Sequence, residues 1–153
     1  MNAQLEKPRP AVVLLSGGLD SSVLLHYVAR SLKHRPIYVL SFRYGQRHAK
    51  ELEMARCQVD LVGDAVVEHR VVELDFFADV AAGASTLVEG GGDVPDLEDV
   101  AESDRDQPPT YVPNRNMMLL SIAVSFAESR KCPVVFYGAQ AQDEYGYWDC
   151  SLE

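Results

Sequence analysis

The residues with the clearest chemical potential form the segment 16–22, SGGLDSS. Two glycines let the backbone turn tightly and bring bare N–H groups against an anion, so a side chain at Gly17 is expected to block phosphate. A helix predicted to follow points its N-terminal N–H groups and its positive dipole end at the same place. The hydroxyls of Ser16, Ser21 and Ser22 add further donors. The pattern predicts a pocket for a pyrophosphate group.

Asp20 lies inside this motif, where a carboxylate beside phosphates would be unfavourable on its own. Two interpretations remain open: the N-cap of the helix, or a ligand of Mg²⁺, direct or through water. The alternative for the whole segment is a strand-turn-helix connection that uses Gly and Ser. It is not a Walker A motif, because no GK[ST] follows, and it is not GxGxxG.

The segments around this motif have the patterns of alternating strands and helices. The apolar run AVVLL at 11–15 suits a strand buried on both faces. After the motif, one face of a predicted helix carries Val23, Leu24, Tyr27, Val28 and Leu32. The other predicted elements are a strand at 36–42, a helix at 48–62 ended by Gly63, a strand at 65–74, a short helix near 76–82, a helix from Asn114 to Lys131 and a strand at 134–138. This order predicts an α/β fold with a doubly wound parallel sheet, in which ligands bind beyond the carboxyl ends of the strands.

Further polar side chains follow two other predicted strands. After the second strand, Tyr44 and Arg47 could stack on and steer a purine-like ligand, or form an exposed helix entry. Arg115 stands in the first turn of a helix, where the dipole disfavours a positive charge, so we expect it to bind phosphate or a substrate carboxylate with Asn116 beside it. A salt bridge to an acidic loop is the alternative for Arg115. After the fourth strand, the candidates for reading a ligand's edge, or for an ordinary exposed loop, are Asp143, Tyr145, Tyr147 and Asp149.

Charge and composition exclude several classes. The net charge is −9, and the stretch 89–106 alone holds eight acidic residues and one arginine. Without a basic run, a long nucleic-acid footprint is not expected, and the apolar runs are too short to span a bilayer. The N-terminus lacks the apolar core of a signal peptide, so a cytoplasmic protein is predicted. The acidic residues lie within a loop at 83–109, predicted to be mobile, and either simply solvated or a lid over the site.

Four ordered segments resemble the 7-cyano-7-deazaguanine synthase family of PP-loop ATP pyrophosphatases. They are SGGLDSS at 16–22, FRYGQRHAKELEMA at 42–55, TYVPNRNMMLLSIA at 110–123 and YGAQAQDEYGYWDC at 137–150. The family usually has Gly where Asn114 stands. The resemblance implies a Rossmann-like adenine nucleotide alpha hydrolase fold over 1–153 as one ATP-binding domain. It also implies a carbon–nitrogen ligase that turns 7-carboxy-7-deazaguanine and ammonia into 7-cyano-7-deazaguanine with ATP and Mg²⁺, through adenylated intermediates, in queuosine-type biosynthesis.

The resemblance assigns roles to individual residues. The catalytic residues are expected to be Asp20, Ser21 and Arg115, with Asp20 as the Mg²⁺ ligand. Substrate binding is expected from Tyr44, Arg47, Arg115, Asn116, Asp143, Tyr147 and Asp149. Nucleotide binding is expected from Leu14, Leu15, Ser16, Gly17, Gly18, Leu19, Asp20, Ser21, Ser22, Val23 and Leu24.

Family members continue to a cluster of four cysteines that binds structural zinc, whereas Cys57, Cys132 and Cys150 form no CxxC pair. The zinc lobe is therefore expected to be missing from this chain. Two other functions stay open at this stage. One is a related PP-loop ligase that adenylates another acceptor, such as a protein or tRNA. The other is a nucleotide-binding module that needs a partner chain. A homodimer is also compatible with the resemblance.

Overall fold

The structure, a computed structural model, describes residues 8–44, 49–76 and 112–139. The chain divides into two compact units, which are described separately. Most of the described residues, including most of the sheet and of its helices, belong to the first unit. Among the described residues, the second unit holds 43–44, 73–76, 112–118 and 139.

The first unit is built on a four-stranded parallel sheet with the strand order β3-β2-β1-β4. The strands are β1 (Ala11–Leu14), β2 (Ile37–Arg43), β3 (Val66–Glu73) and β4 (Val134–Phe136). β1 is central: its Ala11 lies opposite Ile37 of β2 on one side and opposite Val134 of β4 on the other. All four residues of β1 are buried, as expected for a strand covered on both faces.

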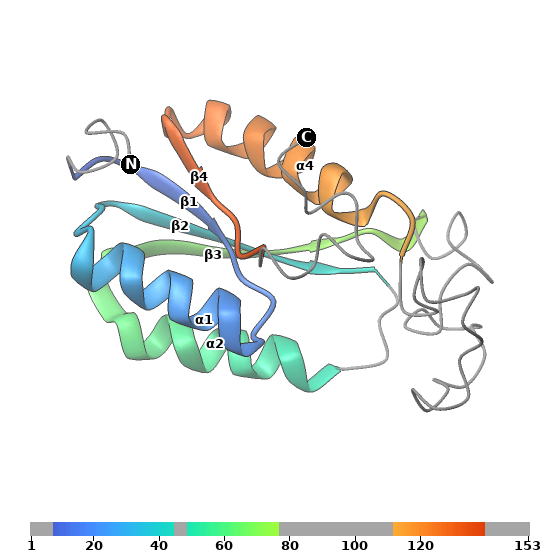
Figure 1. Cartoon of the computed structure of the whole chain (residues 1–153), viewed down its shortest axis with the longest axis horizontal. Helices are drawn as coiled ribbons and strands as arrows, with labels where there is room; N and C mark the ends of the chain where they lie inside the picture. The colour runs from blue at the N-terminus through green and yellow to red at the C-terminus, as the bar shows by residue number, and fades with distance from the viewer. Residues whose placement is uncertain (1–7, 45–48, 77–111, 140–153) are drawn as a thin grey trace, which may run out of the picture. The chain divides into compact units, whose positions relative to one another are not determined.

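Helices cover both faces of this sheet (Figure 1). On one face lie α1 (Leu19–His26), which continues into the π-helical turn η2 (Tyr27–Ser31), and α2 (Ala49–Val62), followed by the 3₁₀ turn η3 (Gly63–Ala65). On the other face lies the part of α4 (Arg115–Ser129) that belongs to this unit, from Leu119 onward. The core under α1 and α2 includes Val13, Leu25, Val28, Val39 and Ala55.

β1 is the point at which the direction of strand addition reverses. The chain moves from β1 to β2 to β3 on one side and then places β4 on the other side of β1. This is the doubly wound parallel sheet predicted from the sequence, and it confirms that fold. In such sheets the crevice for a ligand opens beyond the carboxyl end of the strand at this reversal. The predicted ligand segment, 16–22, follows that strand directly.

The predicted elements are confirmed where the structure describes them, with boundaries shifted by a few residues. Gly63 ends α2 with a φ of +71°, as a helix-terminating glycine should. The last strand is shorter than predicted and ends at Phe136. Most of the short helix near 76–82 and all of the acidic loop at 83–109 lie outside the described residues.

The inward face predicted for the first helix was partly wrong. Val28 is buried, but Val23 and Tyr27 are 59% and 46% exposed. Their places on the inner face are taken by other residues of the same helix, Ser21, Ser22, Leu25 and Ala29. Two physical causes explain the shift: the serines turn inward to bind the loop that precedes the helix, and the wider π turn breaks the 3.6-residue period.

Asn114 precedes α4, as predicted, and its carbonyl accepts a hydrogen bond from the N–H of Met118 at 3.2 Å. Its φ is +53°, in the left-handed region. Glycine adopts this conformation without strain, and asparagine tolerates it better than most other residues. An asparagine at the position where the resemblance implies glycine is therefore compatible with this backbone conformation. Among the described residues, no helix has the length and apolar character needed to cross a membrane.

Candidate functional site

The loop between β1 and α1 begins at Leu15, which is buried and hydrogen-bonded through both its N–H and its carbonyl. The Leu15 side chain is buried, and its N–H donates to the carbonyl of Leu40 on β2 at 2.8 Å. Its carbonyl accepts a hydrogen bond from the Ser41 hydroxyl, also on β2, at 2.6 Å. The first residue of the loop is thus fixed by the neighbouring strand.

Gly17 is required for packing against α2. Its φ is +93°, and a Cβ there would collide with the carbonyl oxygen of Glu51 and lie 2.9 Å from the backbone nitrogen of Ala55. The expectation that this glycine keeps a phosphate side bare is therefore corrected: the side from which a side chain is missing faces backbone of α2. A substitution at Gly17 would displace the loop or the helix.

Gly18 is the glycine that leaves open space. It is the N-cap of α1, with an ordinary extended conformation at φ −70° and ψ 170°. Among the described residues, a Cβ at Gly18 would meet only the hydroxyl oxygen of Ser16, at 3.4 Å. A ligand can therefore approach the backbone closely at Gly18.

Three serines form a hydrogen-bonded network inside the loop. The Ser16 hydroxyl accepts from the N–H of Gly18 at 3.2 Å and lies 3.0 Å from the Ser21 hydroxyl. The carbonyl of Gly18 accepts from the hydroxyls of Ser21, at 3.2 Å, and Ser22, at 2.7 Å. With both protons directed at Gly18, neither Ser21 nor Ser22 offers a hydroxyl proton outward in this arrangement. Donation by these serines to phosphate, and the catalytic role of Ser21, stay predictions.

The first turn of α1 supplies the remaining donors. Because the helix begins at Leu19, the N–H groups of Leu19, Asp20 and Ser21 have no carbonyl of a preceding turn to bind. They and the positive end of the helix dipole make a site suited to an anion. The N-cap interpretation of Asp20 is wrong, since Gly18 holds that position.

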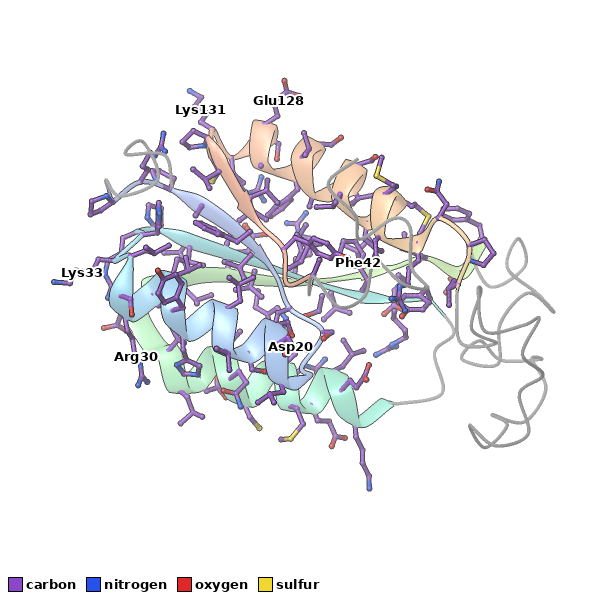
Figure 2. The ribbon with its side chains drawn as sticks, in the orientation of Figure 1. Asp20, Arg30, Lys33, Phe42, Glu128 and Lys131 are labelled. Atoms are coloured by element: carbon purple, nitrogen blue, oxygen red, sulfur yellow. The ribbon has the colours of Figure 1, made fainter. Side chains whose placement is uncertain are left out.

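Asp20 is exposed in the first turn of α1, next to the carboxyl end of β1 (Figure 2). At the other end of the same helical segment lie Arg30 and Lys33 (Figure 2). A carboxylate in a first turn stabilises the helix dipole, and in this position it is also free to meet a cation held by phosphates. Its role as the Mg²⁺ ligand is the interpretation that remains.

The end of β4 reaches the same turn. A Cβ at Gly138 would lie 3.5 Å from the backbone nitrogen and Cα of Ser21 and 3.7 Å from the carbonyl carbon of Asp20. Residues more than a hundred positions apart therefore share one wall of the loop. Because these distances are ordinary contacts, the glycine is not sterically obligatory here.

The second unit brings three predicted substrate-binding residues together. Arg115 donates from Nη1 to the Tyr44 hydroxyl at 3.5 Å and from Nε to Oδ1 of Asn116 at 3.3 Å. Asn116 is 4% exposed, and Tyr44 and Arg115 are half-buried. A phenol, a guanidinium and an amide thus form one polar cluster. The other predicted members, Arg47, Asp143, Tyr145, Tyr147 and Asp149, lie outside the described residues.

The described ranges, with gaps at 45–48 and 77–111, hold no group of three or more His, Cys, Asp or Glu that could bind a metal ion. Cys57 is exposed and free. Cys132 is buried and free, and burial raises the pKa of its thiol. A buried thiol with a raised pKa is chemically inert at neutral pH.

Neither Ser41 nor His69 was singled out from the sequence. Yet the Ser41 hydroxyl, which binds Leu15, also lies 2.9 Å from Nε2 of His69 on β3. A signal for both was present: a serine inside the apolar run IYVLSF and a histidine inside VVEHRVV. A buried hydroxyl such as that of Ser41 needs partners, and the half-buried His69 is one of them.

Comparison with known proteins places these features in one family. The family model described as "Queuosine biosynthesis protein QueC" matches residues 10–153. Similar proteins named 7-cyano-7-deazaguanine synthase come from Caldicellulosiruptor saccharolyticus (44% identical, 94% of this chain and 59% of the relative) and Rhodopirellula baltica (43%, 94% and 54%). Another is from Kineococcus radiotolerans (43%, 95% and 60%). The chain thus spans between half and two thirds of the length of the relatives it matches.

Proposed function

Because the chain belongs to the QueC family of queuosine biosynthesis proteins, we propose that it acts in an ATP-dependent 7-cyano-7-deazaguanine synthase. The reaction would convert 7-carboxy-7-deazaguanine and ammonia into the nitrile. The observation that carries this proposal is the similarity to synthases at 43–44% identity over 94–95% of the chain. The geometry at Gly18 and the start of α1 supports it.

The chemistry explains why ATP would be needed. A carboxylate is a poor electrophile, so a carboxylate oxygen of the substrate would attack the α-phosphorus of ATP and release pyrophosphate. Ammonia would displace AMP from the resulting acyl-adenylate and leave an amide. A second ATP would activate the amide oxygen, and loss of AMP would leave the nitrile. The protein's contribution is positioning and stabilisation of charge.

The loop from Leu15 to Ser22 is suited to hold the pyrophosphate. Gly18 leaves the backbone open, and the N–H groups of Leu19, Asp20 and Ser21 lie unbonded within the helix that follows. Oxygen ligands suit Mg²⁺, which usually keeps several waters and takes one or two carboxylates beside phosphates. We assign that contact to the exposed carboxylate of Asp20.

The cluster of Tyr44, Arg115 and Asn116 is the proposed binding site for the deazapurine acid. The Arg115 guanidinium can pair with a carboxylate, and the Tyr44 ring offers a surface for a flat heterocycle. Asn116 accepts from Arg115 and limits the orientation of the guanidinium. We propose the same role for Arg47, Asp143, Tyr147 and Asp149.

We further propose a homodimer and structural zinc, both implied by the resemblance, with the zinc held by a cysteine cluster that is not among the residues of this chain. A cytoplasmic location is also proposed, as is consistent with a family of biosynthetic enzymes. The two cysteines of the described residues, Cys57 and Cys132, belong to no metal-binding group. Zinc content measured by mass spectrometry, together with the solution mass of the native protein, would test the first two.

The proposed reaction is tested with purified protein at its natural full length, supplied with ATP, Mg²⁺, ammonia and 7-carboxy-7-deazaguanine. We expect AMP, pyrophosphate, the amide and then the nitrile, resolved by chromatography and mass spectrometry. Omitting ammonia should stop the nitrile but leave adenylation. Folded protein that releases no AMP and makes neither amide nor nitrile would contradict the proposal.

A further inference from the structure

Ser41 is a buried polar residue that none of the proposed catalytic steps uses. Its side chain is fully buried at the carboxyl half of β2. The hydroxyl donates its one proton to the Leu15 carbonyl at 2.6 Å, so its contact of 2.9 Å with Nε2 of His69 must be one in which Ser41 accepts. His69 therefore carries a proton on Nε2.

His69 is suited to keep that arrangement constant. Burial lowers the pKa of its imidazole, and the positive charge of Arg56 on α2 lowers it further, whereas Asp60 acts in the opposite direction. The neutral ring is thus the favoured form near neutral pH, and the hydrogen bond to Ser41 selects the tautomer with its proton on Nε2. A neutral donor fixes the direction of the Ser41 hydroxyl toward Leu15.

The orientation of the Leu15 carbonyl also sets the orientation of the Ser16 N–H, because both belong to one peptide plane. In a trans peptide the carbonyl and the following N–H point in opposite directions. Turning the Leu15 carbonyl toward Ser41 therefore turns the N–H of Ser16 away from β2, and this N–H donates to the Ser21 hydroxyl at 3.2 Å. Ser21 in turn donates to the carbonyl of Gly18. Hydrogen bonds on both sides of the Leu15–Ser16 peptide thus connect His69 on β3 to the first turn of α1.

We propose that Ser41 and His69 are positioning residues of the nucleotide-binding loop, which they orient through the Leu15–Ser16 peptide. This inference rests on the proposed use of the loop for the phosphates of ATP. Neither residue touches the ligand. They set where the N–H groups at the start of α1 lie, and so they would act on the affinity for ATP and leave the acceptor site unaffected.

The test compares two substitutions in the same strand, made in the protein at its natural full length. Ser41→Ala removes the hydroxyl, and Ile37→Val removes one buried methylene at the opposite end of β2 as a control for stability. We expect Ser41→Ala to raise KM for ATP about tenfold, the equivalent of one hydrogen bond. KM for the carboxylic acid should not change, and Ser41→Thr, which retains a hydroxyl, should restore most of the ATP affinity.

A second pair of variants guards against a packing effect at Ser41. His69→Gln keeps an N–H donor, whereas His69→Leu removes it, and we expect only His69→Leu to raise KM for ATP, by about threefold. If Ser41→Ala and Ile37→Val show the same KM for ATP at equal thermal stability, the inference is wrong while the proposed function stands. If the unmodified protein releases no pyrophosphate from ATP, the proposed function is what fails.

Discussion

The two candidate binding regions of this protein are built from different groups, one mainly from backbone groups and the other from side chains. The loop at 15–22 is made of main chain: its geometry depends on a glycine against α2, a glycine with open space, and serine hydroxyls bound to a backbone carbonyl. The cluster of Tyr44, Arg115 and Asn116 is made of side chains, joined at the longer distances of 3.3 and 3.5 Å.

This difference separates two kinds of specificity. A backbone site recognises what every nucleotide triphosphate shares, and any added side chain disturbs it. A side-chain cluster recognises one acceptor, and it tolerates conservative exchange at the cost of affinity. We therefore expect substitutions in the loop to lower the stability of the protein or its turnover. Substitutions in the cluster should raise KM for the acceptor.

The largest effect is expected at the two adjacent glycines. Gly17→Ala should lower the free energy of unfolding by about 3 kcal/mol, because the new Cβ combines left-handed strain with a collision against α2. Gly18→Ala should cost about 1 kcal/mol or less, as an N-cap change in open space, yet reduce pyrophosphate release about tenfold. Chemical denaturation and a pyrophosphate assay measure the two effects. Equal stability of the two variants would undo the distinction between them.

Asp20→Ala should lower kcat at least about a hundredfold and leave the fold intact, because the carboxylate is exposed and its proposed partner is Mg²⁺. Steady-state turnover with varied Mg²⁺ measures this, and circular dichroism checks the fold. Glu51→Ala, a carboxylate in the first turn of α2, is the matched control. An Asp20→Ala variant with normal kinetics would remove Asp20 from the site.

Arg115→Lys and Tyr44→Phe should each raise KM for the carboxylic acid about tenfold and leave KM for ATP unchanged. Lysine loses the planar pair of donors, and phenylalanine loses the hydroxyl that accepts from Arg115. Initial rates with each substrate varied in turn give both constants. A rise in KM for ATP instead would mean that the cluster holds phosphate, which was the other expectation for Arg115.

The smallest effect is expected at a residue that belongs to neither region. Glu68 on β3 accepts two hydrogen bonds from Arg130, at 3.0 and 3.2 Å, and this guanidinium also lies 4.7 Å from the Phe126 ring centre. Glu68→Gln should lower Tm by about 2 °C at pH 7 without changing either KM.

The difference in Tm should depend on pH in a defined direction. The hydrogen bond from Arg130 lowers the pKa of the Glu68 carboxyl. Its contribution is therefore present above the ordinary carboxyl pKa and is lost as the pH falls through the lowered value of the folded protein. Melting curves of both proteins should converge in acid. A constant difference at all pH values would show that the charge is not responsible.

The sequence predicted the sheet well because its signals are local. Apolar runs mark buried strands, and Gly63 and the residues before α4 mark the ends of helices. It predicted the face of α1 poorly, because a π turn and inward serines do not follow a 3.6-residue period. It identified Gly17 as part of the loop but expected its missing side chain to make room for phosphate. In the structure the missing side chain makes room for the backbone of α2, a contact between segments far apart in the sequence. The partnership of Ser41 and His69 was equally out of reach, because nothing in either run states which strand lies beside which.

The central place of β1 has a consequence for the order in which the protein is made. β1 and the loop after it lie within the first 22 residues, but β4, the strand that flanks β1 on its second side, spans Val134–Phe136. At ribosomal speeds of about 5–20 residues per second, roughly ten seconds separate the two. During that time β1 has β2 on one side only, and the wall that Gly138 provides for the first turn of α1 does not yet exist. The loop at 15–22 is thus synthesised well before the segment that completes its wall, and its surroundings form only when β4 pairs with β1.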